Sequence, residues 1–528
     1  MNYYHIIYFV LFLCSFSSQS DAQESLNMDL FDLANTGDQR YSGSWVYVDT
    51  ARNREYALLG ASGGTAIFDI TEQPIKELFF IRGPFSNWRE ITVLGDHAYV
   101  VTEGTGVGEG MQVIDLNFLP TAARLVTTYT TTFTTGHIIQ RDIYSEAPYV
   151  YVNGACSSCG INILDVSTPE SPRQVGLYNP GYYIHDCHVK GDFLYAAAFF
   201  EGTIDIVDIS DKTRPVLIAQ IEDPGGNTHS SWLTEDDQYL IISDELDGLP
   251  ARIWNIADLE NMFEVATYTA NENSLTHNPY VRGDYAFFSH NTEGIRAVDI
   301  KDPRLPLEVG FYDTFDRPSG GFNGLWSACP YLPSGKIIGG DRDEGLFVWT
   351  FNNTVANRIY VTILDASTNT PVNGVDLTIN EEQGKKLLSE QIGYATLEEQ
   401  LDLSIIASGY EAVDTLVVLE EGEQLEVTIF LTPISVSNID INQLTNKINA
   451  YPNPYRNSTT LDLSELPTAN RIEVYDAAMN LYDNRMIQNK EPLLELKEQG
   501  QSSGVFYYMI YDKLDRLIAT GKLLKIGK

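Results

Sequence analysis

The segment Thr203-Ile-Asp-Ile-Val-Asp208-Ile209 is one of seven similar stretches between Thr65 and Trp349. Each is a short run of apolar and β-branched residues, and most of the runs close on an aspartate. The closing residues are Asp69, Asp115, Asp165, Asp208, Asn255, Asp299 and Trp349, and successive ones are 43 to 50 residues apart. A repeat of this length that carries several strands is typical of four-stranded propeller blades.

Solenoids of paired helices have similar periods, but these segments lack a helical pattern and are rich in strand-forming residues. We therefore predict an all-β protein with a seven-bladed β-propeller over residues 41–352. Its strands are apolar on both faces because each blade packs between two neighbours.

The N-terminus has the features of a secretory signal peptide over residues 1–22. The apolar run Ile6 to Phe16 is too short to span a bilayer, and the small residues Ser20 and Ala22 suit cleavage. Residues 23–40 then lead into the propeller, and no later segment predicts a transmembrane span. We expect an exported protein, secreted or attached to the outer-membrane surface.

The cysteines of an exported chain favour disulfides. Cys156 and Cys159 are separated by two serines in a loop between blade strands, which favours a small structural disulfide. Labile thiols or a metal site are the alternatives, although no second ligand pair follows at zinc-finger spacing. The state of Cys187 and Cys329 is left open.

The formal net charge of −38 argues against nucleic acid or an anionic membrane as partner, because phosphate contacts need basic patches. A solubilising surface explains this charge. Cation binding is the alternative, since Asp341-Arg-Asp343-Glu344 and Asp244-Glu245 are oxygen-rich, but neither has the spacing of an EF-hand loop.

Two further domains are predicted after the propeller. Residues 356–432 contain alternating strands such as Tyr360 to Asp365, typical of a small β-sandwich. With Asn373-Gly374-Val375 and Gly409-Tyr410 they resemble the carboxypeptidase regulatory-like, transthyretin-like module, which implies a spacer role. Residues 433–448 form a linker.

Residues 449–528 begin Asn449-Ala-Tyr451-Pro452-Asn453-Pro454 and continue through Gly504-Val-Phe-Tyr-Tyr508. This segment resembles the C-terminal sorting domain of the type IX secretion system, which is also a β-sandwich. The resemblance implies the type IX secretion machinery as a partner and a source among the Bacteroidota.

The first strand of each blade lines the channel of a propeller, so residues at blade starts converge on one axis. Five of the eight histidines lie at these starts. The candidate channel residues are Arg89, Glu90, His137, His185, Asp186, His188, His229, His277, Asn278 and Trp326, together with the loop carboxylates Asp244 and Glu245.

Two interpretations of these residues stay open. Imidazoles beside carboxylates can hold a transition metal or supply acid–base groups, with His185, His229 and His277 as candidate ligands. Alternatively, the side chains hydrogen-bond between blades and fill a narrow channel, and ligands on different blades lie too far apart to share one ion. We assign no catalytic residue and predict no cofactor, a divalent metal being the alternative.

Several separated motifs resemble the choice-of-anchor B family, whose propellers contain LVIVD-type repeats. They include Tyr41-Ser-Gly-Ser-Trp45, Trp88-Arg-Glu90, Thr228-His-Ser-Ser-Trp232 and Thr276-His-Asn-Pro-Tyr-Val281. The resemblance covers residues 27–352 and implies export or surface display, without an established reaction. We expect a binding or adhesion protein for a glycan or protein ligand. The alternatives are a metal-assisted hydrolase and a structural envelope protein; no nucleophile elbow or zinc-protease motif favours an enzyme.

Overall fold

The computed structural model describes residues 24–37, 39–155, 160–387, 391–434, 448–478, 480–487, 493–497, 503–514 and 516–526. These residues form strands and turns and contain no helix, and hence none that could cross a membrane. The predicted signal peptide and the Cys156–Cys159 pair lie outside the described residues. Two compact units, Met1–Thr432 and Pro433–Lys528, make up the chain.

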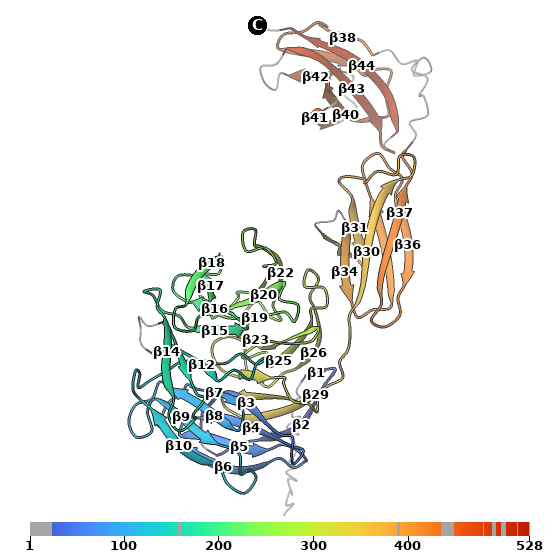
Figure 1. The fold of residues 1–528 in the computed structure, drawn as a ribbon. Helices are drawn as coiled ribbons and strands as arrows, with labels where there is room; N and C mark the ends of the chain where they lie inside the picture. Colours follow the sequence, from blue (N-terminus) through green and yellow to red (C-terminus); the bar gives the residue numbers. More distant parts are fainter. Residues whose placement is uncertain are drawn as a thin grey trace, which may run out of the picture. The chain divides into compact units, whose positions relative to one another are not determined.

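The first unit contains seven antiparallel blades around a channel, which confirms the predicted seven-bladed propeller (Figure 1). Blade 1 consists of β3 (Tyr41–Asp49), β4 (Arg54–Ala61), β5 (Gly64–Asp69) and β6 (Lys76–Arg82). Blade 2 consists of β7 (Arg89–Leu94), β8 (His97–Thr102), β9 (Met111–Asp115) and β10 (Arg124–Tyr129). Blade 3 consists of β11 (Ile138–Gln140), β12 (Tyr149–Asn153), β13 (Ile161–Asp165) and β14 (Arg173–Tyr178).

The remaining blades follow in chain order. Blade 4 consists of β15 (Asp186–Lys190), β16 (Phe193–Ala198), β17 (Thr203–Asp208) and β18 (Val216–Glu222). Blade 5 consists of β19 (Thr228–Leu233), β20 (Tyr239–Asp244), β21 (Ala251–Asn255) and β22 (Phe263–Tyr268). Blade 6 contains β23 (Asn278–Arg282), β24 (Tyr285–Ser289), β25 (Ile295–Asp299) and β26 (Leu307–Tyr312), and blade 7 contains β27 (Leu325–Cys329), β28 (Ile337–Asp341) and β29 (Gly345–Phe351).

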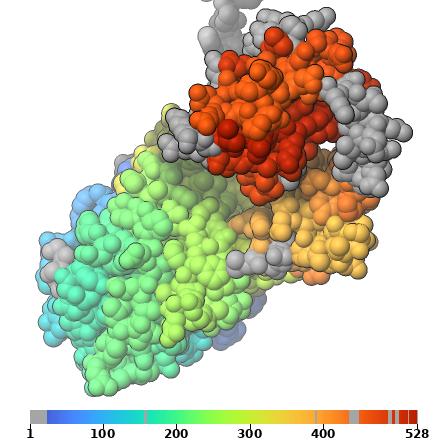
Figure 2. Space-filling view, turned by 90° about the horizontal axis from the view of Figure 1, so that it is seen from above, coloured from blue at the N-terminus to red at the C-terminus, as the bar shows by residue number. Residues whose placement is uncertain are grey.

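Residues 25–34, which the sequence left as a lead-in, complete the last two blades. β2 (Met28–Ala34) pairs with β29 as the outer strand of blade 7, and β1 (Ser25–Leu26) adds a fifth strand to blade 6. The first strand of blade 7 also contacts that of blade 1, which closes the ring. In the space-filling view the colours change from blue to green around the propeller, because blades that follow one another in the sequence lie side by side (Figure 2).

The periodic closing residue has a local structural reason. In six blades its side chain accepts a hydrogen bond from the backbone N–H two residues later, which turns the chain after the third strand. The acceptors are Asp69, Asp115, Asp165, Asp208, Asn255 and Asp299, at 2.8–3.2 Å. The strands before these turns are buried on both faces, as in the 0% exposed Ile204 and Ile206. Cys187 and Cys329 are buried free thiols on β15 and β27.

Two four-stranded sheets follow in the same unit. Their orders are β33-β34-β30-β37 and β32-β31-β35-β36. The strands are β30 (Asn357–Asp365), β31 (Asp376–Ile379), β32 (Glu382–Gln383), β33 (Lys385–Lys386), β34 (Ile392–Thr396), β35 (Gln400–Ile406), β36 (Val413–Val418) and β37 (Gln424–Leu431). The buried ion pair Arg358–Asp299, 2.6 Å, ties β30 to blade 6.

The second unit also consists of two sheets, ordered β38-β39-β42 and β41-β40-β43-β44. Its strands are β38 (Ala450–Tyr451), β39 (Ser458–Asp462), β40 (Ala469–Asp476), β41 (Leu481–Met486), β42 (Leu493–Lys497), β43 (Gly504–Asp512) and β44 (Leu517–Lys525). Leu461, Ile472 and Ile510 are in its separate core.

Candidate metal centre in the propeller channel

Two positions in each blade bring side chains to one end of the channel. The first is the start of the inner strand, which provides His137, His185, His229, His277 and Trp326 in blades 3 to 7. The second is the residue that follows the second strand, which provides Glu103, Phe199, Glu245 and Arg342 in blades 2, 4, 5 and 7. Because the second strand runs antiparallel to the first, its end lies beside the first strand's start.

The rings of the first position form a continuous arc. Centroids of neighbouring rings are 4.4 Å apart for His137–His185 and for His185–His229, and 4.3 Å apart for His229–His277 and for His277–Trp326. Five successive blades thus place their first aromatic side chain against the next one.

Two members of the arc lie in β-bulges. The register between β19 and β20 shifts between Thr228 and Ser230, so His229 is the extra residue. In blade 7 the register shifts between Leu325 and Ser327, so Trp326 occupies the same place. A bulge bends the strand and redirects a side chain, which explains how these two large rings turn into the channel.

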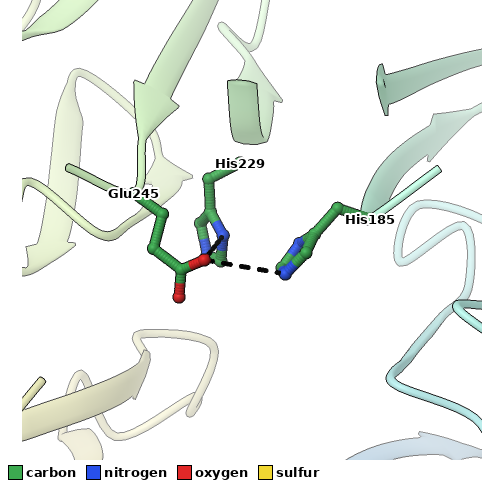
Figure 3. A group of neighbouring side chains, drawn as sticks. All are labelled: His185, His229 and Glu245. Carbon is green, nitrogen blue, oxygen red and sulfur yellow. Dashed lines mark ion pairs between the residues drawn. The ribbon is translucent and has the colours of Figure 1, made fainter. Parts of the chain in front are cut away.

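The Glu245 carboxylate lies next to His229 and faces His185 (Figure 3). Its Oε2 atom is 3.6 Å from Nδ1 of His229 and 3.9 Å from Nε2 of His185, and its Oε1 atom is 3.7 Å from Nε2 of His277. These separations exceed hydrogen-bond length. Nδ1 of His229 and Nε2 of His277 are nevertheless buried and have no hydrogen-bond partner.

Two of the rings form hydrogen bonds through the nitrogen that faces away from Glu245. Nε2 of His229 lies 2.9 Å from Oδ1 of Asn278, and Nδ1 of His277 lies 3.0 Å from the carbonyl oxygen of Trp326. The Asn278 oxygen is an acceptor, so Nε2 of His229 carries a hydrogen, whereas Nδ1 of His277 also lies 3.1 Å from the donor Nδ2 of Asn278. In the neutral His229 ring, Nδ1 then directs its lone pair toward the Glu245 carboxylate, which is the pattern of a metal-ligating histidine held by an outer hydrogen bond.

The spacing fits one ion. Ligand atoms of His185, His229 and Glu245 all lie within 4.8 Å of one another. Ligands about 2.1 Å from a tetrahedral ion are about 3.4 Å apart from one another. The His185 ring would therefore have to move by about 1 Å for all three ligand atoms to bind the same ion. The histidines of blades 4 and 5 are thus close neighbours, and whether they share one ion stays a prediction.

The electrostatics differ among the three imidazoles: the neutral form is favoured for His185 and His277, and the protonated form for His229. Burial lowers the pKa of His185 well below its ordinary value and that of His277 to about 4. For His229, burial is outweighed by the Glu245 charge, and its pKa is raised. Burial would also raise the pKa of Glu245, but the imidazoles of His229 and His277 hold it well below its usual range. Neutral imidazole and carboxylate are the forms that bind metals.

Two predicted carboxylic acids lie at the next position along the inner strands. Glu90 accepts a hydrogen bond of 3.1 Å from Nε1 of Trp326, and the space for this contact exists because Gly43 has no Cβ. Burial raises the pKa of Glu90 to about 8 and that of Asp186 to about 6. Glu90 is therefore largely protonated at neutral pH and can donate a proton into the channel.

The other predicted residues lie around this group or outside it. His137 contacts Glu103 at 2.8 Å and extends the arc, and Asn278 acts through His229. Arg89 donates instead to the Ala61 and Pro84 carbonyls between blades.

His188 and Asp244 point elsewhere. His188 packs against Trp232, with ring centroids 4.3 Å apart, and burial lowers its pKa to about 3. Burial, reinforced by Asp223, raises the pKa of Asp244 to about 7, and Asp244 accepts a hydrogen bond from the Asn227 N–H.

Glu103, Phe199 and Arg342 are the channel residues that the sequence did not single out. All three directly follow a second strand. An alignment of the seven second strands would have selected this position, but their ends share no residue type.

Comparison with known protein families supports the repeat. The LVIVD repeat model matches residues 183–223 and 277–314, which contain the inner strands of blades 4 and 6. No curated protein matches the chain.

Several solved structures are similar to the chain, all at low identity. A putative 6-phosphogluconolactonase from Bacteroides uniformis is 15% identical, with a TM-score of 0.43 over 60% of this chain and 93% of its own. One from Bacteroides fragilis is 13% identical, with a TM-score of 0.43 over 64% and 95%. A functionally unknown protein from Desulfotomaculum acetoxidans is 12% identical, with a TM-score of 0.43 over 56% and 95%.

Proposed function

We propose that this is an exported β-propeller protein that binds a divalent transition-metal ion at the mouth of its channel and a ligand beside that ion. The observation that carries the proposal is the group of His185, His229 and Glu245, whose ligand atoms lie within 4.8 Å of one another and in which Nδ1 of His229 is buried without a hydrogen-bond partner. A lone pair facing a carboxylate is repulsive unless a proton or a metal ion lies between them, and a metal ion would take the place of that proton. His185 supplies the third protein ligand.

The types of ligand narrow the choice of metal ion. Two imidazoles and one carboxylate suit zinc or ferrous iron and leave positions open for a ligand. The low exposure of the side chains, 7% for His185, 2% for His229 and 14% for Glu245, strengthens electrostatic interactions at the site.

The test is the metal content of the full mature protein. Mass spectrometry of the wild type after dialysis should find about one zinc or iron per chain, and His229→Ala should lose it. His97→Ala is the matched control, because His97 begins β8 at the end opposite the channel mouth. A wild type that binds no divalent metal, even after loading, would overturn the proposal.

Metal-assisted hydrolysis is the second candidate, favoured by Glu90. A carboxylic acid whose pKa is about 8 can supply the proton that a leaving group needs. Hydrolysis of ester panels by the zinc-loaded wild type, with loss in Glu90→Gln but unchanged metal content, would support it. If the zinc-loaded protein hydrolyses none of the esters, binding of a metal and a ligand remains the proposed function.

Export by the type IX system is proposed from the resemblance of residues 449–528 to sorting domains, and the resemblance of residues 356–432 favours a spacer. A glycan or protein at the cell surface is the proposed partner. A chain without residues 449–528 should remain in the periplasm of a type IX-competent host, whereas the full chain should reach the surface or medium. Equal export of both would refute this route.

A further inference from the structure

Arg342 differs from the other buried arginines of the described chain. Its side chain is 4% exposed but donates no hydrogen bond, and its Nε and Nη1 atoms are buried without a partner. The guanidinium groups of Arg89, Arg296 and Arg358 all donate hydrogen bonds to protein oxygens. A guanidinium has five N–H donors and no acceptor, so burial without an oxygen is costly.

Neighbouring carboxylates do not serve Arg342. Asp341 accepts from the Thr314 hydroxyl and from the backbone N–H groups of residues 343 and 344. Asp343 pairs with Arg40 and Arg317. Burial and the nearby Arg40 lower the pKa of Arg342 to about 10, so it remains a cation at neutral pH.

Two indole rings hold the guanidinium instead. Cζ of Arg342 is 4.4 Å from the ring centroid of Trp88 and 4.9 Å from that of Trp326, and the two indoles stack at 4.7 Å. Such cation–π contacts stabilise the charge and orient the planar group, but they leave its N–H donors free.

Arg342 shares the channel mouth with the candidate metal centre. Its backbone N–H donates to the Gly324 carbonyl as that of Glu245 donates to the Asn227 carbonyl, so the two residues hold equivalent places in blades 7 and 5. Trp326 links the two regions, because it contacts both Arg342 and the His277 ring.

We propose that Arg342 binds an oxyanion, the carboxylate or phosphate group of the ligand that occupies this channel mouth. The proposal deepens the proposed function, on which it rests for the place of the ligand, by naming the ligand as an organic anion. Nε and the Nη groups can form two parallel hydrogen bonds to one such group, while the indoles form an apolar shelf beside it.

The test is calorimetric titration of the full mature protein, zinc-loaded and zinc-free, with inorganic phosphate and with succinate. Binding to the wild type should weaken at least about tenfold in Arg342→Met, the loss expected for hydrogen bonds to a charged group. Arg342→Lys keeps the charge but lacks the planar guanidinium, so its anion affinity should lie between those of the wild type and Arg342→Met. Arg214→Met, an exposed arginine on blade 4, is the charge-matched control.

The outcomes separate this proposal from the metal centre. Arginine-dependent anion binding by a protein that takes up no metal would refute the metal centre and leave the anion site standing. Normal metal content with equal anion binding by the wild type and Arg342→Met would refute the anion site alone. Failure of both anions to bind the wild type would also overturn it, and preference for one of them identifies the ligand group.

Discussion

In blade 5 the bulged residue of the inner strand is His229 and the residue after the second strand is Glu245, whereas blade 7 holds Trp326 and Arg342 at the same two places. The backbone of the two blades is equivalent at these places. Blade 5 supplies imidazole nitrogens and a negative charge, whereas blade 7 supplies an apolar indole surface and a positive charge. A repeated scaffold can thus build two complementary halves of one site from two variable positions per blade.

The largest expected effect comes from removing the negative charge of blade 5. Glu245→Gln keeps the shape but should weaken zinc binding about 300-fold, since three ligands share a binding free energy of the order of 10 kcal/mol. Competition with a fluorescent chelator measures this. Glu103→Gln changes the equivalent residue of blade 2 and should alter zinc affinity less than threefold, about 0.6 kcal/mol. Similar losses in both variants would show that the whole ring, rather than blade 5, holds the ion.

The second-largest effect concerns the buried ion pair between blade 7 and blade 1. Lys336, just before β28, forms a buried 2.9 Å ion pair with Glu55 of blade 1 and donates to the carbonyls of Ile70 and Thr71. Lys336→Met leaves the carboxylate buried and should lower the free energy of unfolding by about 3 kcal/mol in urea titrations. Lys190→Met removes an ion pair whose partner, Asp237, is 55% exposed, and should cost less than about 1 kcal/mol. Equal losses of unfolding free energy in the two variants would mean that the contact between blades 7 and 1 stabilises the propeller no more than an exposed ion pair does.

The Glu55–Lys336 pair also predicts a pH dependence. Burial raises the pKa of Glu55, but hydrogen bonds from Lys336 and Ser334 outweigh it, so the pKa is below its ordinary value. The stabilisation is then complete above the unfolded value of about 4.3 and is lost as the pH falls from there through the folded value. Unfolding experiments between pH 3 and 7 should show a smaller acid loss for Glu55→Gln than for the wild type. Parallel profiles would contradict this contribution.

The sequence predicted the fold better than the site because different interactions determine them. Closing aspartates such as Asp208 recur because each makes the same local turn, so their period marks the blades. The inner-strand histidines followed from that period, and seven of the predicted residues do gather at one end of the channel: His137, His185, His229, Glu245, His277, Asn278 and Trp326.

The remaining features depend on pairing between distant segments. β2 joins β29 across more than 300 residues, and no local pattern in Met28–Ala34 indicates its partner. Arg342 gave no signal because two flanking aspartates suggest ordinary ion pairs, and only the contacts of Asp341 and Asp343 show that those oxygens are occupied. The role of a variable position is decided by its neighbours in space.

The smallest expected effect tests the residue that connects the two halves. Oδ1 of Asn278 accepts from His229, and its Nδ2 donates to the Trp326 carbonyl, 3.2 Å away. Asn278→Ala should weaken zinc binding about tenfold, the lower end of the range for losing an outer hydrogen bond, because the tautomer of His229 is no longer fixed. Asn278→Asp keeps an acceptor for His229 and should restore most of the affinity. The absorption spectrum of the cobalt-substituted protein should shift in the alanine variant and return in the aspartate variant, which a general loosening of the channel would not produce.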